Sequence, residues 1–281
     1  MLDTMRIEFM KMHGLGNDFI VFDAPAASAP ALTAQQFSAL ADRHTGIGCD
    51  QALMLEPPHE SKTRAYYRIF NADGSEVEQC GNGVRCLASL LYERAPQGGR
   101  EFLLDSPGGR IEARVREDGL VSVDMGTPNF APASLPFKAS GESYLYPLNV
   151  NGKEIDIGAV SIGNPHAVLQ VPDIDAAPVD RLGSAIEHHP RFARRTNVGF
   201  MQILDRGHIL LRVHERGVGE TRACGTGACA AVAVGRRHGL LDEEVEVTLK
   251  GGKVWISWAG DAQHLWMTGP VARVFAGSVD I

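Results

Sequence analysis

Two cysteines stand in nearly the same short motif, and thiols so placed can carry out acid–base chemistry. Cys80 begins the motif Cys-Gly-Asn-Gly, and Cys224 begins the motif Cys-Gly-Thr-Gly. The ordinary pKa of a thiol is about 8.5, so a modest change of environment brings it close to neutral pH. The two motifs therefore supply a matched pair of groups that can each take up or release a proton.

Each cysteine is expected at the N-terminus of a helix. After Cys80, apolar residues recur at helical spacing over 84–91 and indicate one buried face. After Cys224, residues 228–234 are apolar throughout, which is typical of a helix buried on all sides. The first N–H groups of a helix have no partner within it, and the helix dipole favours negative charge there. This position should favour a thiolate or a bound anion, with the thiol pKa brought near neutral.

The two motifs belong to a longer internal repeat. The paired segments are residues 16–21 with 163–168, 44–51 with 195–202, and 71–80 with 215–224. This alignment matches Gln51 with Gln202. Landmarks that recur in the same order at nearly constant separation indicate an internal duplication. Coincidence among glycine-rich turns is the alternative, and it leaves the close match of the cysteine motifs unexplained.

The repeat predicts an α+β fold. We expect two pseudo-symmetric domains, each a many-stranded sheet or barrel wrapped round a central helix. The first would comprise residues 1–125 with 268–281 returning to it, and the second would comprise residues 126–267. Because small-ligand sites often lie between domains, we expect the active site in the interdomain cleft.

A matched pair of acid–base groups suits the inversion of a carbon centre. One group removes a proton from one face, the other delivers a proton to the opposite face, and the roles exchange in the reverse direction. A carbanion beside a carboxylate also needs fixed dipoles, worth about 3 kcal/mol for one well-placed donor. The candidate donors are the backbone N–H groups of Gly81, Asn82, Gly225 and Thr226.

The rest of the sequence gives no sign of a cofactor or a metal. No lysine stands in a recognisable motif near the cysteines, and the cysteine spacings differ from those of zinc sites. We therefore expect no cofactor and no metal. The remaining cysteines, Cys49, Cys86 and Cys229, are expected to pack in the core.

Composition limits the partners. The 281 residues carry a net charge of −7, which disfavours nucleic acid or an anionic membrane surface. The N-terminal residues lack the apolar segment of a secretory signal, and the apolar run 223–235 is too short to span a bilayer. We expect a cytoplasmic protein that acts on a small molecule.

Several motifs together resemble the diaminopimelate epimerase family. They are Met-His13-Gly-Leu-Gly-Asn17-Asp-Phe, Asn71-Ala-Asp-Gly-Ser-Glu, Cys80-Gly-Asn-Gly, Gly163-Asn164-Pro-His166, Glu215-Arg216-Gly and Ala-Cys224-Gly-Thr-Gly-Ala-Cys. The resemblance runs from about Arg6 to the segment Met267-Thr-Gly-Pro. It implies a cofactor-independent enzyme that interconverts LL- and meso-2,6-diaminopimelate, on the bacterial route to lysine and peptidoglycan.

The resemblance also implies roles for individual residues. Cys80 and Cys224 would be the acid–base pair, with His166 and Glu215 helping to set their protonation states. The carboxylate at the reacting carbon would be held by Gly81, Asn82, Gly225 and Thr226. The rest of the site, including the distal amino-acid end, would be lined by Asn17, Gln51, Asn71, Asn164, Asn197, Glu215 and Arg216. A homodimer is implied too, although Phe275 stands where the family often has a tyrosine thought to help dimerisation.

Three other functions remain open at this stage. A proline or hydroxyproline racemase-like enzyme would share the fold and the paired cysteines, but a proline ring offers nothing for Glu215 and Arg216 to bind. A cysteine hydrolase would use Cys224 as nucleophile and His166 as base, which leaves the Cys80 motif unexplained. A non-catalytic module would bind an anion at the two helix ends.

Overall fold

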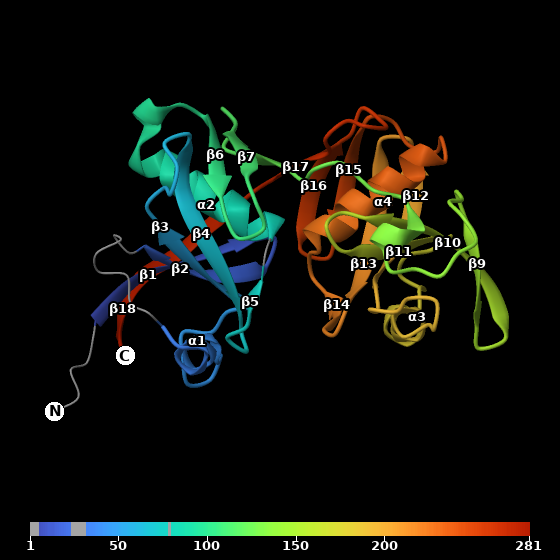
Figure 1. Cartoon of the computed structure of the whole chain (residues 1–281), viewed down its shortest axis with the longest axis horizontal. Coiled ribbons are helices and arrows are strands. Elements are labelled where there is room, and N and C mark those ends of the chain that lie inside the picture. The colour runs from blue at the N-terminus through green and yellow to red at the C-terminus, as the bar shows by residue number, and fades with distance from the viewer. Residues whose placement is uncertain (1–5, 24–31, 78–79) are drawn as a thin grey trace. The chain divides into compact units, whose positions relative to one another are not determined.

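The computed structural model describes residues 6–23, 32–77 and 80–281. The chain divides into two compact units, whose elements are labelled in Figure 1. Unit 1 extends to Val123 and includes Gly269–Ile281, whereas unit 2 is Asp124–Thr268. Each unit has its own apolar core, which includes Phe22 in unit 1 and Phe200 in unit 2.

In unit 1, a mixed β-sheet is built round a central helix. Its elements are β1 (Arg6–Gly14), β2 (Asn17–Asp23), α1 (Ala34–Ala41), β3 (Gln51–Glu56), β4 (Thr63–Asn71), β5 (Glu76–Val77), α2 (Gly81–Arg94), the 3-10 helix Pro96–Gly98, β6 (Glu101–Asp105), β7 (Ile111–Val115), β8 (Val121–Asp124) and β18 (Ala272–Asp280). Helix α2 packs against β1, β2 and β7, and α1 packs against β3 and β4.

Two strand pairs of unit 1 are parallel, and each encloses a helix. β2 pairs parallel with β3, and β4 with β6, while β1–β2, β3–β4 and β6–β7 are antiparallel. Parallel neighbours need a long crossover, which α1 provides between β2 and β3 and α2 provides between β4 and β6. The C-terminal strand β18 pairs antiparallel with β1.

Unit 2 repeats this arrangement. Its elements are the 3-10 helix Pro132–Ser134, β9 (Tyr146–Val150), β10 (Lys153–Ser161), β11 (Pro165–Gln170), α3 (Val179–Glu187), β12 (Asn197–Asp205), β13 (His208–Glu215), β14 (Gly219–Thr221), α4 (Gly225–Arg237), β15 (Glu244–Leu249), β16 (Gly252–Ser257) and β17 (Trp266–Gly269). β11–β12 and β13–β15 are parallel, while β10–β11, β12–β13 and β15–β16 are antiparallel. The strands β1 to β7 of unit 1 show the same order of parallel and antiparallel pairs.

The strand register corrects one detail of the sequence alignment. Gln51 lies opposite Phe19 in unit 1, and Asn197 lies opposite His166 in unit 2. Phe19 and His166 occupy the same position in the two repeats, so Gln51 corresponds to Asn197. The prediction that it corresponds to Gln202 is wrong. Register is set by hydrogen bonding between strands, which the similarity of short glycine-rich turns does not report.

Helix α1 begins with a capping box. The Thr33 side chain accepts a hydrogen bond from the backbone N–H of Gln36, and the Gln36 side-chain oxygen accepts one from the backbone N–H of Thr33. This capping box satisfies donors that the helix leaves open. The buried face then stacks Phe37 on Phe70 of β4, with ring centroids 4.0 Å apart.

Helix α2 is more deeply buried than its sequence pattern predicts. The predicted face is buried at residues 84, 87 and 88, but burial extends beyond it, because residues 81–88 are all buried and Arg85 is fully enclosed. The strands of unit 1 surround the first two turns of this helix, so the polar residues there are covered as well. Helix α4 is buried from Gly227 to Gly235, as predicted.

Packing requires the second glycine of each cysteine motif. A Cβ at Gly83 would lie 3.1 Å from Leu53 Cδ2. A Cβ at Gly227 would lie 2.9 Å from Val213 Cγ2 and 3.2 Å from the sulfur of Cys224. The first turn of each helix therefore approaches the sheet more closely than a side chain would allow.

The C-terminal end of α3 carries a buried carboxylate that holds a turn. Glu187 Oε2 lies 3.0 Å from His214 Nε2, and Glu187 Oε1 accepts a hydrogen bond from the backbone N–H of Gly217 at 2.9 Å. Burial raises the pKa of Glu187, but the bonds from His214 and Gly217 outweigh burial and leave that pKa below its ordinary value. Glu187 thus fixes the turn that follows β13.

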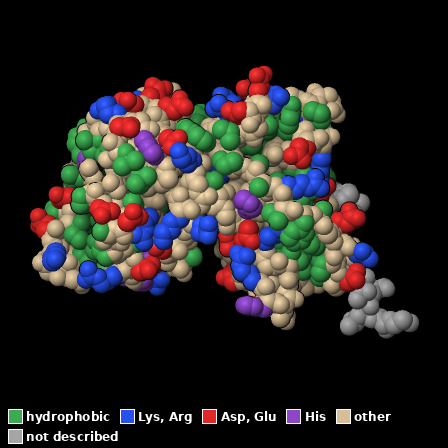
Figure 2. Space-filling model, turned by 180° about the vertical axis from the view of Figure 1, so that it is seen from behind, with side chains coloured by type: hydrophobic (Ala, Val, Ile, Leu, Met, Phe, Trp, Pro, Cys, Tyr) green, Lys and Arg blue, Asp and Glu red, His purple; other side chains and the backbone are tan. Residues whose placement is uncertain are grey.

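The surface is mixed in charge. Figure 2 shows Lys and Arg side chains interspersed with Asp and Glu over the visible face. Within the described ranges, no helix has the length and apolar character to cross a membrane. No group of three or more His, Cys, Asp or Glu among those residues is arranged to hold a metal ion.

Replacing Gly227 with alanine should overpack the start of α4. The new methyl group would press on Val213 and on the Cys224 side chain, and we expect unit 2 to lose about 1–3 kcal/mol of unfolding free energy. Urea unfolding monitored by circular dichroism measures this loss. Gly207→Ala is the matched control, because its Cβ would meet only Asp205 at 3.6 Å. Equal effects of the two variants would contradict the packing argument.

Glu187→Gln should destabilise the protein by about 1–3 kcal/mol at pH 7, because one amide oxygen cannot replace both carboxylate acceptors. The folded-state pKa of Glu187 lies below its unfolded value, so its contribution is present above about pH 4.5 and is lost as pH falls through the folded pKa. The stability gap between wild type and variant should therefore shrink in acid. Urea unfolding at pH 7 and pH 4 tests this, with the exposed Glu154→Gln as control. A gap independent of pH would refute it.

Candidate functional site

In unit 1, three predicted site residues lie at one edge of the sheet. Asn17 begins β2, Gln51 begins β3 and Asn71 ends the antiparallel strand β4. Gln51 and Asn71 are register partners, and Gln51 Nε2 donates to Asn71 Oδ1 at 3.0 Å. The sheet thus gathers three amide side chains from distant parts of the sequence, all of them partly exposed.

Cys80 caps helix α2 beside this edge. Its backbone is extended, and the intrahelical ladder begins with Val84 N donating to Cys80 O at 3.0 Å. Asn17 Oδ1 lies 3.8 Å from Cys80 Sγ and accepts from Asn82 Nδ2 at 3.1 Å. The structure therefore brings Cys80, Asn82 and Asn17 together, with a half-buried thiol at a helix N-terminus.

A charged cluster behind Asn17 was not anticipated from the sequence. Asn17 Nδ2 donates to Asp50 Oδ2 at 3.0 Å, and Arg43 donates to both Asp50 and Asp18 at 2.7 Å. Lys11 Nζ lies 2.6 Å from Asp18. Burial raises the pKa of Asp18, but Arg43 and Lys11 outweigh it and hold that pKa well below its usual range. In the sequence, each of two predicted site residues has an aspartate as its neighbour, and this pattern could have indicated the charged cluster.

Unit 2 repeats the edge with different side chains. Asn197 begins β12 beside His166 of β11, and Glu215 ends β13. Both ends of the Asn197 amide bond to backbone, because Oδ1 accepts from Arg216 N at 2.9 Å and Nδ2 donates to Pro165 O at 3.1 Å. Asn197 is buried and thus fixes the backbone at Arg216.

Cys224 caps helix α4 in the same way as Cys80 caps α2. The ladder of α4 begins with Ala228 N donating to Cys224 O at 3.0 Å. Cys224 Sγ lies 3.7 Å from Thr226 Oγ1 and is hydrogen-bonded to Glu215, whose carboxylate also accepts from Thr221 Oγ1. The predicted pair Cys224 and Glu215 is therefore in direct contact.

The expected acidic thiol is wrong for Cys224. Burial, followed by the charge of Glu215, raises the pKa of Cys224 well above its ordinary value. Hydrogen bonds from Thr226 and from the Gly227 N–H lower that pKa but do not compensate. Desolvation of the thiolate thus outweighs the helix N-terminus, and Cys224 is protonated in this state.

His166 is a neutral, fully buried side chain. Burial, with a further effect of the Arg216 charge, lowers the pKa of His166 to about 3. His166 Nε2 lies 2.9 Å from Asn164 Oδ1, and Nδ1 makes no hydrogen bond to any described residue. Because a buried N–H without a partner is rarer than a free acceptor, the proton belongs on Nε2. Asn164 Nδ2 then donates to Thr226 Oγ1 at 3.5 Å.

The other three thiols lie in the core, as predicted. All five cysteines carry thiol groups, and Cys49, Cys86 and Cys229 are buried. Burial raises the pKa of Cys49 to about 11 and that of Cys86 to about 12. These thiols are inert packing groups.

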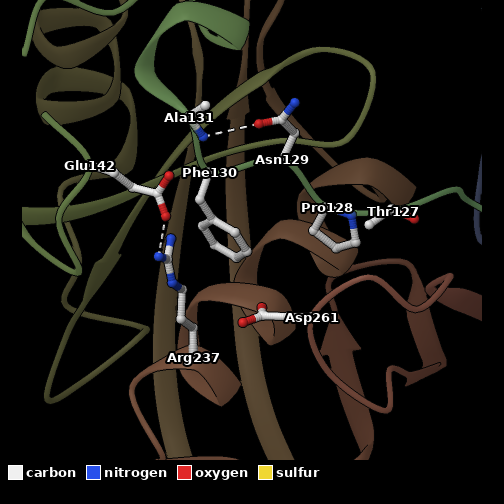
Figure 3. Close-up of a pocket in the computed structure, with 8 residues that line it drawn as sticks. All are labelled: Thr127, Pro128, Asn129, Phe130, Ala131, Glu142, Arg237 and Asp261. Atoms are coloured by element: carbon white, nitrogen blue, oxygen red, sulfur yellow. Dashed lines mark hydrogen bonds and ion pairs between the residues drawn. The ribbon is translucent and has the colours of Figure 1, made fainter.

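A cavity of about 350 Å³ in unit 2 contains none of the predicted site residues. It is lined by Thr127, Pro128, Asn129, Phe130, Ala131, Glu142, Arg237 and Asp261 (Figure 3). The Arg237 guanidinium lies 4.1 Å from the Phe130 ring centroid and is paired with Glu142. These contacts tie the end of α4 to the segment after β8, which is a structural role.

Each unit therefore presents a thiol, a helix N-terminus and oriented amides at one sheet edge. In α2 the N–H groups of residues 81–83 precede the ladder, and in α4 those of residues 225–227 do. The arrangement can bind a carboxylate and exchange a proton with a neighbouring carbon.

The chain is similar to proteins that are known by name. The sequence profile "Diaminopimelate epimerase" matches residues 9–131 and 158–274. A diaminopimelate epimerase of Nitrosomonas europaea is 55% identical, over 99% of this chain and 100% of the relative. Another from Alkalilimnicola ehrlichii is 52% identical, over 98% of this chain and 99% of the relative.

Solved structures share the fold at lower identity. A hydroxyproline epimerase from Agrobacterium vitis superposes with a TM-score of 0.69 at 17% identity, covering 98% of this chain and 93% of that one. A PhzF-family protein from Bacillus anthracis gives a TM-score of 0.68 at 16% identity, covering 99% and 100%. These likenesses concern architecture alone. Because the family profile and the named relatives cover nearly the whole sequence, the chain belongs to the diaminopimelate epimerase family.

Proposed function

We propose that the protein interconverts LL- and meso-2,6-diaminopimelate without a cofactor, using Cys80 and Cys224 as acid and base. The observation that carries the proposal is the repeated thiol, since each cysteine caps the central helix of its own repeat. Relatives at 52–55% identity that bear the name of this epimerase support the substrate. The product would serve bacterial lysine and peptidoglycan synthesis.

In the proposed mechanism the two thiol groups act from opposite faces of the α-carbon. The thiolate of one cysteine takes the α-proton, and its S–H bond forms as the C–H bond breaks. The electron pair passes into the substrate carboxylate, and the S–H proton of the other cysteine then adds to the opposite face of the carbon. The N–H groups of Gly81, Asn82, Gly225 and Thr226 would stabilise the charge on the carboxylate, at about 3 kcal/mol for a well-placed donor.

Glu215 is proposed to adjust the proton of Cys224. It accepts a hydrogen bond from that thiol and raises its pKa. Cys224 is thereby prepared as the acid, with its proton available to the carbanion. His166 supports the site indirectly, because it orients Asn164 and through it Thr226.

The distal end of the substrate carries an ammonium and a carboxylate, and we assign it to the remaining polar residues. Amides, a carboxylate and a guanidinium together match such a zwitterion. The residues proposed for distal binding are Asn17, Gln51, Asn71, Asn164, Glu215 and Arg216. Asn197 is assigned a supporting role, because its amide is engaged with backbone at both ends.

A proline or hydroxyproline racemase-like activity is the second candidate, since a hydroxyproline epimerase has the same architecture. We favour diaminopimelate because unit 2 supplies both a carboxylate and a guanidinium at residues 215–216. A proline ring has no second charged end to pair with them.

Solvent-isotope exchange tests the substrate. Wild-type protein in deuterium oxide with a reductant should incorporate deuterium at the α-carbon of LL-diaminopimelate and invert it, as followed by NMR without added cofactor. L-proline should show no exchange. Exchange with proline alone would overturn the substrate while keeping the mechanism, and exchange with neither would overturn the function.

The same assay tests the paired thiols. Cys80→Ala and Cys224→Ala should each lower turnover by about 10²–10⁴-fold, the range typical of removing one acid–base group. Cys86→Ala is the thiol control on α2, and it should retain activity in proportion to the folded fraction. Full activity in either Cys80→Ala or Cys224→Ala would contradict the two-base mechanism.

We also propose that the protein is a cytoplasmic homodimer. Five cysteines in the thiol form suit a reducing compartment. On β18, residues 273–276 are exposed, and Phe275 and Val274 keep 46% and 54% of their surface accessible. We assign these two exposed apolar side chains to the contact between the two copies.

Sedimentation velocity tests the dimer. The wild-type protein should sediment as a dimer at micromolar concentration, and Phe275→Asp should shift it toward a monomer because the charge would be desolvated at the interface. Leu204→Asp on β12 is the matched control, since Leu204 is similarly exposed at 48%. A monomeric wild-type protein, or equal effects of both variants, would refute this interface.

A further inference from the structure

We infer that Asp50 is a positioning residue that acts on Cys80 through Asn17. By holding the amide of Asn17, Asp50 keeps an oxygen rather than an NH2 group facing the thiol, and so favours the protonated form of Cys80. The catalytic meaning of this arrangement rests on the proposed function, but the arrangement itself can be measured without any substrate.

The geometry leaves Asn17 one orientation. Asp50 Oδ2 accepts from Asn17 Nδ2 at 3.0 Å and from Asp18 N at 3.1 Å. An ionised carboxylate has no donor, so the amide nitrogen of Asn17 must face Asp50 and the amide oxygen must face away. That oxygen lies 3.8 Å from Cys80 Sγ and 3.1 Å from Asn82 Nδ2.

An acceptor beside a thiol affects its proton. A thiol S–H can donate to the amide oxygen, whereas a thiolate would face the negative end of the amide dipole. A hydrogen bond to the neutral form of an acid raises its pKa. If the amide were free to turn over, its NH2 group would instead stabilise the thiolate. The orientation set by Asp50 therefore opposes ionisation of Cys80.

Unit 2 holds the corresponding amide in the opposite sense. Asn164 occupies the position of Asn17, and its Oδ1 is engaged by His166 Nε2 at 2.9 Å. Its Nδ2 therefore donates to Thr226, which corresponds to Asn82, at 3.5 Å. The repeat thus presents an amide acceptor toward Asn82 and an amide donor toward Thr226.

The carboxylate of Asp50 is itself fixed. Asp50 Oδ1 accepts from Arg43 at 2.7 Å, and Arg43 is also paired with Asp18, which Lys11 contacts from β1. The titratable groups that interact electrostatically with Cys80 include Tyr67 of β4 and Cys86 of α2, and α2 also carries the buried Arg85.

The test is a double-mutant cycle read out at Cys80. Iodoacetamide alkylation of the full-length protein is followed from pH 6 to pH 10, and the Cys80 peptide is quantified by mass spectrometry. Asp50→Ala should lower the alkylation midpoint by about one pH unit, the size typical of a lost hydrogen bond to the neutral form. Asn17→Ala should lower it similarly. Asp50→Ala in the Asn17→Ala background should have no further effect.

Two further variants separate positioning from charge and from loop distortion. Asp50→Asn keeps the acceptor for Asn17 Nδ2, so its midpoint should stay within about 0.3 pH units of wild type. Asp42→Ala removes another carboxylate of the same loop, one that bonds His44 N and Thr45 N, and should leave the midpoint unchanged.

Three results would overturn the inference. These are an unchanged midpoint in Asp50→Ala, an equal fall in Asp50→Asn, or an Asp50→Ala effect that persists without the Asn17 amide. The last two would identify a simple charge effect. Because alkylation needs no substrate, these outcomes are independent of whether diaminopimelate is epimerised.

Discussion

The structure depends on placing a thiol at the N-cap of a helix that is buried inside a sheet. Cys80 and Cys224 each occupy this position, and the glycines at 83 and 227 let the first helical turn pack closely against the sheet. Burial removes water from the thiol and so disfavours the thiolate, whereas the N–H groups at the helix end favour it. The chemistry of each half follows from the balance between desolvation and these fixed donors.

The duplication gives this position twice, and side-chain differences make the two copies unlike. The strand pairings repeat one for one, so corresponding residues arrive at corresponding sheet edges. At those edges unit 1 has neutral amides backed by Asp50, whereas unit 2 has Glu215 and a neutral His166. A fold built from equal halves thus holds its two thiols in different electrostatic surroundings.

Features that depend on residues close together in the sequence could be predicted from the sequence. The Thr33 cap, the helix after Cys224 and the three core thiols follow from residue type and spacing. What depends on tertiary contacts was not predictable. The match of Gln51 with Asn197 is set by strand register, and the raised pKa of Cys224 depends on burial beside Glu215. Asp50 was not predicted as a site residue because its proposed role depends on the side chain to which it is hydrogen-bonded.

An inversion between two like groups requires that they differ at each moment, since one must carry the proton that the other lacks. With identical surroundings, both thiols would ionise at the same pH, and much of the protein would hold two thiols or two thiolates. The two thiols do not have identical surroundings, because Cys80 faces the amide oxygen of Asn17, whereas Cys224 is hydrogen-bonded to the carboxylate of Glu215. The fold therefore provides symmetry of position, and the different acceptors beside Cys80 and Cys224 break the symmetry of charge.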